Sequence, residues 1–253
     1  MKILAINPNT SESFNELLRN KAAIYALQST EIEVISPESG PEVIEGIYDE
    51  SLSIQKTIET FIDLEKNFDA FIIACFSDHL ATYAIREITH KPVLGIAEAS
   101  IYLASMLGEK FSIITTNDRW KPLLTDAVKK YGVEAKCASI RTIGLSVSDL
   151  EERKGESIKK IIENEASIAL HQDGAEVICL GCAGMSGFDK ELNKKLGIPV
   201  LDGFVCAIKL LEVVHQYGLT HSKINTYSQP LYKELTNLPS KFSKVYGKKS
   251  KKK

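Results

Sequence analysis

The chain alternates short apolar runs with longer stretches in which apolar and polar residues are mixed. Four of the runs are residues 2–6 (KILAI), 68–75 (FDAFIIAC), 110–114 (KFSII) and 175–182 (AEVICLGC). Runs of about four to eight apolar residues bounded by turn residues are typical of buried strands. The mixed stretches at 12–27 (ESFNELLRNKAAIYAL) and 121–132 (KPLLTDAVKKYG) are typical of helices. This alternation predicts a parallel α/β architecture.

Two segments of the chain, residues 69–107 and 175–213, are versions of one unit. Cys75 and Cys182 lie 107 residues apart, and so do Pro92 and Pro199. Each unit therefore has the same spacing of 17 residues between its cysteine and its proline. Each unit is predicted to form a buried strand, a helix, a second strand that begins at the proline, and an apolar helix. Self-similarity at a fixed spacing indicates a structural repeat.

The start of each half supports the repeat. The strand at 2–6 runs into Asn-Pro-Asn-Thr-Ser, and the strand at 110–114 runs into Thr-Thr-Asn-Asp. Serine and threonine before a helix are expected N-caps, and Pro122 suits an early helical position. We therefore expect an α/β fold of two pseudo-symmetric parallel-sheet domains with the active site between them. The first domain comprises residues 1–105 and the returning C-terminal segment 206–253, and the second comprises residues 106–205.

The ends of the predicted strands indicate where a ligand binds. In open parallel sheets, ligands bind beyond the carboxyl ends of the strands. Four such ends are expected here, at residues 7–11, 75–78, 115–117 and 182–186. If the two domains face each other, Cys75 and Cys182 approach one cleft from opposite sides.

Composition and net charge indicate which kinds of molecule the chain is expected to bind. With 44% hydrophobic and 25% charged residues among 253, the chain resembles a folded globular protein with a substantial core. The net charge of −2 argues against nucleic acid as a partner, and the lysine-rich tail at 248–253 is interpreted as a solvated terminus. The apolar runs are too short for a membrane span or a signal peptide. We therefore predict a cytoplasmic protein with reduced thiols that binds a small molecule.

The motif Cys179-Leu180-Gly181-Cys182 invites a metal or redox interpretation. A metal site needs more ligands than this lone pair offers, and a spacing of three along one strand sends the two thiols to opposite faces. A thioredoxin-like redox pair opens a helix, whereas Cys179 lies within an apolar run. We therefore expect no metal here. Cys179, Cys137 and Cys206 are interpreted as core thiols.

Cys75 and Cys182 differ from the other cysteines because each ends its strand beside polar or glycine residues. One thiol on each side of a bound carbon supplies an acid and a base. Abstraction of a proton next to a carbonyl by one group, and reprotonation by the other, inverts the carbon. A free thiol pKa of about 8.5 needs only modest lowering by nearby helix N-termini for this role. Backbone N–H groups at Ala183 and Gly184 suit the enolate oxygen that develops.

Other polar residues have simpler interpretations. Asp78 is expected to cap the helix that follows it, and Arg86 and Glu87 are expected to form a pair on the surface of that helix. His79 is either a solvated residue at the helix start or a residue at the edge of the pocket. Glu98 either braces the site or lies in a polar loop.

Several of these motifs together carry a resemblance to a known family. They are INPNTS at 6–11, Cys75 with SDHLATYAIRE at 77–87, PVLGIAEAS at 92–100, FSIITT at 111–116, LGCAGM at 180–185, PVLDGFVCAIKLLE at 199–212 and HSKINTYSQP at 221–230. The chain resembles the hydantoin and allantoin racemases of the aspartate/glutamate racemase superfamily over almost its whole length. One departure is visible, because the family tends to have Asp-Pro where this chain has Asp78 and His79.

The resemblance implies a two-cysteine racemase of allantoin or 5-substituted hydantoins that needs no cofactor and assembles into homo-oligomers. Carried over to this chain, it makes Cys75 and Cys182 the two catalytic acid/base residues. The residues that it implies for substrate binding are Asn7, Ser77, Thr115, Thr116, Ala183 and Gly184. Between the two ring substrates we expect allantoin, because purine breakdown is the more general source of a hydantoin.

Other functions stay open at this stage. Within the enzymes, the alternatives are a racemase of free aspartate or glutamate and a related decarboxylase or isomerase. Two thiols favour racemisation over decarboxylation, and a free amino acid requires a clamp of charged residues that we do not find at the strand ends. Outside the enzymes, the alternative is a ligand-binding protein that retains the cleft. A nucleotide site is disfavoured because neither a Walker A pattern nor a convincing GxGxxG follows a strand.

Overall fold

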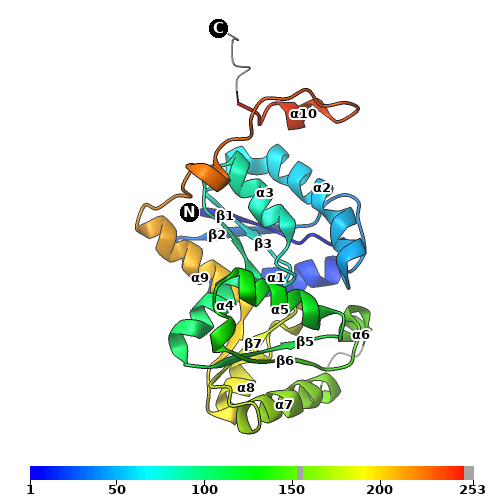
Figure 1. The fold of residues 1–253 in the computed structure, drawn as a ribbon, viewed down its shortest axis with the longest axis vertical. Coiled ribbons are helices and arrows are strands. Elements are labelled where there is room, and N and C mark those ends of the chain that lie inside the picture. Colours follow the sequence, from blue (N-terminus) through cyan, green and yellow to red (C-terminus); the bar gives the residue numbers. More distant parts are fainter. Residues whose placement is uncertain (153–155, 248–253) are drawn as a thin grey trace.

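The computed structural model describes residues 1–152 and 156–247 and contains two parallel four-stranded sheets (Figure 1). The first sheet has the order β2-β1-β3-β4 and the second has the order β6-β5-β7-β8. The strands are β1 (Lys2–Ile6), β2 (Glu31–Ile35), β3 (Ala70–Ile73), β4 (Val93–Gly95), β5 (Phe111–Thr115), β6 (Cys137–Thr142), β7 (Val177–Leu180) and β8 (Val200–Asp202). The same strand order occurs twice, which confirms the predicted repeat and the α/β fold class.

The helices alternate with the strands in both halves. Those of the first half are α1 (Glu12–Tyr25), α2 (Ile47–Leu64), α3 (Leu80–Ile88) and α4 (Ile96–Leu107). The second half contains α5 (Trp120–Lys130), α6 (Val147–Glu152), α7 (Glu156–His171), α8 (Asp189–Leu196) and α9 (Gly203–Gln216), and α10 (Ser240–Ser243) lies in the C-terminal segment. The Ser11 hydroxyl caps α1 by accepting from the Phe14 N–H at 3.4 Å, as the sequence predicts. Within the described residues, no helix combines the length and the apolar character that a membrane span requires.

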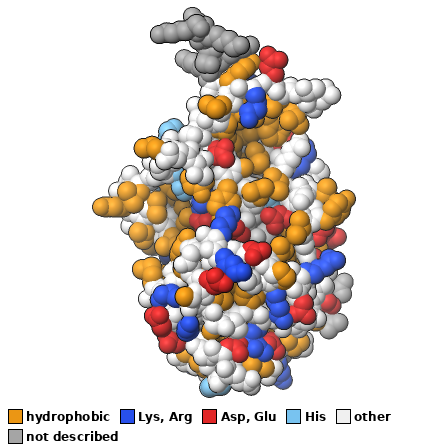
Figure 2. All heavy atoms as spheres, in the orientation of Figure 1, with side chains coloured by type: hydrophobic (Ala, Val, Ile, Leu, Met, Phe, Trp, Pro, Cys, Tyr) orange, Lys and Arg blue, Asp and Glu red, His pale blue; other side chains and the backbone are white. Residues whose placement is uncertain are grey.

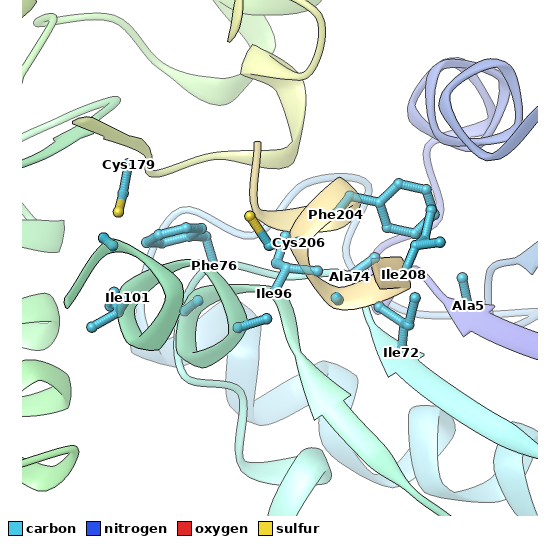
Figure 3. Close-up of a cluster of buried hydrophobic side chains, with 14 of the residues drawn as sticks. Ala5, Ile72, Ala74, Phe76, Ile96, Ile101, Cys179, Phe204, Cys206 and Ile208 are labelled. Carbon is cyan, nitrogen blue, oxygen red and sulfur yellow. The ribbon is translucent and has the colours of Figure 1, made fainter. Parts of the chain in front are cut away.

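Helices α4 and α9 join the two halves into one core. They pack against each other, and each also reaches the opposite half, since α4 contacts β7 and α9 contacts β3 and β4. Figure 3 shows this shared core, where Cys179 of β7 lies near α4 and Phe204 of α9 lies among residues of the first sheet. The helices approach so closely that a Cβ added at Gly203 would lie 2.7 Å from the Ile96 carbonyl oxygen. The two halves are therefore fixed relative to each other.

The C-terminal segment returns over the first half, where Figure 1 shows it beside α3 and above α2. The Lys223 ammonium donates to the carbonyl oxygens of Arg86 and Glu87, both at 2.7 Å, and so caps the C-terminal end of α3. Further along, Lys241 pairs with Asp63 of α2 at 2.6 Å. Hydrophobic side chains stay exposed on this part of the surface (Figure 2), and Leu231 is 84% exposed. The lysine-rich tail interpreted from the sequence lies outside the described residues.

Arg86 and Glu98 form a buried ion pair, so the predicted surface pair on α3 is wrong. Both side chains are more than nine-tenths buried, and the guanidinium also donates to the Val93 carbonyl oxygen at 2.8 Å. Glu98 lies in the first turn of α4 and not in a loop. The ring of Tyr227, from the returning segment, lies over the guanidinium, with its centroid 5.7 Å from the Arg86 Cζ. The local pattern of α3 gives no sign of burial because the covering residues come from distant segments.

Candidate active site

A pocket lies at the carboxyl ends of β3, β5 and β7, and residues from both halves line it. It holds about 450 Å³ of empty space when the open solvent at its mouth is included. Cys75 enters from the loop after β3, and Cys182 enters from the loop after β7. Four of the predicted binding residues also line it, namely Ser77, Thr116, Ala183 and Gly184. The structure thus brings the two pseudo-equivalent thiols to one pocket.

The loop after β3 is held from both halves of the molecule. Asp78 has a positive φ of 59°, which is uncommon for a residue with a side chain. Its carboxylate accepts from the Tyr131 hydroxyl at 2.5 Å and from the Lys130 ammonium at 2.8 Å, both on or next to α5 of the second half. The Tyr83 hydroxyl of α3 also donates to it. These bonds fix the loop that carries Cys75 against the opposite half.

His79, rather than Asp78, caps α3, so the predicted role of Asp78 is wrong. The His79 ring is 1% exposed, its Nδ1 accepts from the Ala81 N–H at 3.2 Å, and its Nε2 lies 2.8 Å from the Ser53 hydroxyl. Burial lowers the pKa of His79 to about 4, so the imidazole is neutral near neutral pH. His79 lies at the helix start, as predicted, but it is not solvated and it does not line the pocket.

The loop after β7 cradles its own cysteine. Cys182 precedes a short 3₁₀ turn, Ala183–Met185, in which the Met185 N–H donates to the Cys182 carbonyl oxygen at 3.0 Å, and the N–H groups of Gly184 and Met185 lower the pKa of the Cys182 thiol. A Cβ added at Gly184 would lie 3.0 Å from a ring carbon of Phe14, which explains why glycine occupies this position. The Ser186 hydroxyl donates to Asp202, the N-cap of α9, and ties the loop to the shared core.

Two predicted binding residues do not line the pocket. The Asn7 side-chain amide donates to Asn9 at 2.7 Å and to Asn15 at 3.0 Å, and the Thr115 hydroxyl donates to the Gly181 carbonyl oxygen at 3.0 Å. Asn7 and Thr115 therefore brace the loops. Asn9, in the same strand end at residues 7–11 but not among the predicted binding residues, lines the pocket instead. The Thr116 hydroxyl is fully buried and has no hydrogen-bond partner within the described part of the chain.

The rest of the wall is apolar. It is formed by Phe14, Ile44, Phe76, Trp120 and Val147. Sequence reasoning missed these residues. Phe14 and Trp120 have the pattern of core-facing residues in a helix, and Ile44 and Val147 do not follow a predicted strand. Five side chains with large apolar surfaces thus line the pocket together with the two thiols.

The cysteines outside the pocket serve the core. Cys179 is fully buried and its thiol points to the Ser100 carbonyl oxygen at 3.7 Å, and Cys206 is 4% exposed. Both confirm the core interpretation, whereas Cys137 is only half-buried. Among residues 1–152 and 156–247, no three histidine, cysteine, aspartate or glutamate side chains gather where they could hold a metal ion.

A comparison with known families decides the assignment. The family described as Asp/Glu/Hydantoin racemase matches residues 3–211. The chain belongs to this family. The racemase is 42% identical over 245 residues to a hydantoin racemase of Pseudomonas sp. (strain NS671), across 96% of this chain and 98% of that protein. The resemblance read from the sequence is confirmed.

Two solved structures share the whole fold of the racemase. An allantoin racemase from Klebsiella pneumoniae superposes with a TM-score of 0.89 at 34% identity, over 97% of this chain and 99% of that one. An allantoin racemase from Pseudomonas fluorescens superposes with a TM-score of 0.89 at 36% identity, over 94% of this chain and 100% of that one. The fold class and the assignment as a racemase enzyme are therefore confirmed.

The environment of the two thiols opposes their ionisation, and does so unequally. Burial raises the pKa of Cys75 to about 12; hydrogen bonding with Ser77 lowers it, and the negative charges of Glu50 and of an ionised Cys182 raise it. Burial also raises the pKa of Cys182, to about 11, while the nearby N–H groups of Gly184 and Met185 lower it and the charge of Glu45 raises it. Of the two thiols, Cys182 therefore has the lower pKa.

We expect Cys182 to react as a thiolate at a lower pH than Cys75. The thiolate is the nucleophile, so alkylation by iodoacetamide rises with pH as each thiol ionises. Mass spectrometry of the two cysteine peptides gives a separate rate for each thiol at each pH. The unfolded chain in denaturant is the control, because there both thiols return to their ordinary pKa. An alkylation curve for Cys75 that rises before that of Cys182 would contradict the assignment.

Proposed function

We propose that the racemase inverts C5 of a hydantoin-type ring, with Cys75 and Cys182 acting as acid and base on opposite faces of that carbon. The observation that carries the proposal is the position of the two thiols, which come from equivalent loops of the two halves and line one pocket. A hydantoin C5 proton lies beside a carbonyl carbon and a ring nitrogen. Its acidity is therefore within reach of a thiolate.

Each turnover moves two protons and forms one intermediate. The Cys182 thiolate takes the C5 proton, and the electron pair of the broken C–H bond moves toward the neighbouring carbonyl oxygen to give an enolate. The Cys75 thiol then protonates C5 from the other face, and the ring is released with inverted configuration. Cys182 is now the thiol and Cys75 the thiolate, which is the form that converts the opposite enantiomer.

The polar groups around the thiols are suited to hold the ring. The Thr116 hydroxyl has no partner among the described residues, and the Asn9 and Ser77 side chains line the same pocket. We propose that these groups and the backbone of Ala183 and Gly184 bind the ring carbonyl and N–H groups. A buried polar group left unpaired costs free energy, so a ligand that pairs with Thr116 gains affinity.

The apolar wall distinguishes between the two ring substrates. Allantoin carries a polar ureido group at C5, whereas an amino-acid hydantoin carries an amino-acid side chain there. Phe14, Ile44, Phe76 and Val147 offer apolar contact only, and Trp120 adds a large apolar ring with a single indole N–H donor. We therefore propose 5-substituted hydantoins with apolar side chains as the preferred substrates and allantoin as the second candidate, the reverse of the order expected from the sequence.

The substrate is tested with single enantiomers of allantoin, 5-benzylhydantoin and 5-isobutylhydantoin in D₂O. Optical rotation reports inversion, and proton NMR reports loss of the C5 proton. We expect kcat/KM to be at least about tenfold higher for the two apolar hydantoins, since each methylene buried in an apolar pocket contributes about 1 kcal/mol. A preference for allantoin would overturn the substrate order. No exchange above the spontaneous rate with any of the three would overturn the function.

The roles of the two thiols are tested with Cys75→Ser and Cys182→Ser. A serine hydroxyl is a far weaker base than a thiolate, so each variant is expected to lose racemisation by a factor of at least about 10³. Each variant keeps one thiol and is expected to exchange the C5 proton of one enantiomer only, with the opposite preference in the two variants. Cys137→Ser, outside the pocket, is the matched control and keeps full activity. Racemisation at the parent rate by either pocket variant would contradict the two-base assignment.

A further inference from the structure

A second cavity, which we call the outer cavity, adjoins the active-site pocket. It holds about 780 Å³ of empty space when the open solvent at its mouth is included. Its apolar lining comes from α1, α6, α7 and the loop after β7, namely Leu17, Leu150, Ile158 and Phe188. Phe14 and Gly184 line both the outer cavity and the active-site pocket. These two residues therefore form a wall that the two cavities share.

The shared wall is a single aromatic ring packed on the backbone of a glycine. A Cβ added at Gly184 would lie 3.0 Å from one carbon of the Phe14 ring and 3.4 Å from the next. It would also lie 3.2 Å from a methyl carbon of Leu150, which lines the outer cavity. Helices α1 and α6 both contact the 3₁₀ turn that contains Gly184. The Phe14 side chain is thus the part of this wall that a substitution can remove.

The backbone that carries Phe14 is held independently of its ring. The Phe14 N–H donates to the Ser11 hydroxyl at 3.4 Å, and the next residue, Asn15, accepts from the Asn7 amide at 3.0 Å. The Asn15 amide also donates to the Ser36 hydroxyl at 3.0 Å. These bonds fix the start of α1 through groups other than the ring. A smaller side chain at position 14 is therefore expected to open the wall without moving the two cysteine loops.

The proposed reaction restricts where the C5 substituent of a hydantoin can lie. Cys75 and Cys182 approach C5 from opposite faces, and C5 is planar in the enolate. The substituent therefore lies in the plane between the two sulfurs and points at neither of them. The polar groups proposed to bind the ring occupy one part of the pocket, so the substituent is left with the apolar wall. Phe14 belongs to that wall and has the outer cavity behind it.

We propose that Phe14 sets the upper size limit of the C5 substituent, and that the outer cavity receives larger aromatic substituents once the Phe14 ring is replaced by a smaller side chain. This inference rests on the proposed racemisation of hydantoins. An apolar lining with a few polar groups is typical of sites for small organic molecules. The outer cavity has this character, since Glu16 and Asn20 line it as well and are exposed to solvent. Phe14 contacts the substituent and not the reacting carbon, so it determines specificity.

The test measures kcat/KM of the parent, Phe14→Leu and Phe14→Ala with single enantiomers of 5-isobutylhydantoin and 5-(2-naphthylmethyl)hydantoin. Optical rotation reports racemisation. We expect the ratio of kcat/KM for the naphthylmethyl compound to that for the isobutyl compound to rise at least about tenfold in both variants, because accommodating one further apolar group changes kcat/KM by about that factor. Phe14→Leu keeps a buried apolar side chain and serves if Phe14→Ala is unstable. Circular dichroism and thermal melting establish that each variant is folded.

Leu17→Trp shows whether the gain comes from the outer cavity. Leu17 is half-buried on α1 and lines the outer cavity but not the active-site pocket. Alone, Leu17→Trp is the matched control and is expected to leave kcat/KM unchanged with both compounds, because Phe14 still closes the wall. Added to Phe14→Leu, the indole fills the outer cavity and is expected to return the ratio to within about threefold of the parent value.

The outcomes separate the role of Phe14 from the proposed function. An unchanged ratio in the folded Phe14 variants would overturn the role of Phe14 while leaving the two-thiol function intact. A gain that survives the addition of Leu17→Trp would place the larger substituent elsewhere and would overturn the role of the outer cavity. If the parent exchanges no C5 proton of 5-isobutylhydantoin, the function fails and this inference fails with it.

Discussion

The rigid joint between the two halves is the constraint on which the racemase depends. Two thiols can act on opposite faces of one carbon only if the loops that carry them keep a fixed separation, because proton transfer requires contact distance. The shared core of α4 and α9 supplies this rigidity beneath the pocket, since each helix packs on the other half. Above it, Asp78 ties the loop of Cys75 to α5 through Tyr131 and Lys130.

The burial of the two thiols in this pocket also opposes their ionisation. Burial raises the pKa of both thiols, whereas the proposed mechanism uses one of them as a thiolate. The two halves respond differently, despite their common fold. Backbone N–H groups lower the pKa of Cys182, whereas at Cys75 hydrogen bonding with Ser77 lowers the pKa and the charge of Glu50 raises it. The two pseudo-equivalent thiols therefore lie in different surroundings.

Much of the fold could be predicted from the sequence because its signals are local. The apolar runs gave the central strands, and the shared spacing of cysteine and proline gave the repeat that places Cys75 opposite Cys182. Contacts between segments that are far apart in the sequence produce no such local pattern. The sequence predicts an exposed Arg86 on α3, but Glu98 and Tyr227 cover it in the structure. Similarly, His79 is buried against α2, where it lies next to the Ser53 hydroxyl. The cytoplasmic location and the homo-oligomer stay predictions.

The central claim is that one carbon lies between the two sulfurs. A crystal structure of the Cys75→Ser variant with one enantiomer of 5-benzylhydantoin tests it directly. The account predicts that the ring lies in the pocket with C5 within about 3.5 Å of the side chains at positions 75 and 182, one on each face. A ring whose C5 contacts only one of the two side chains, or which binds outside the pocket, would contradict it.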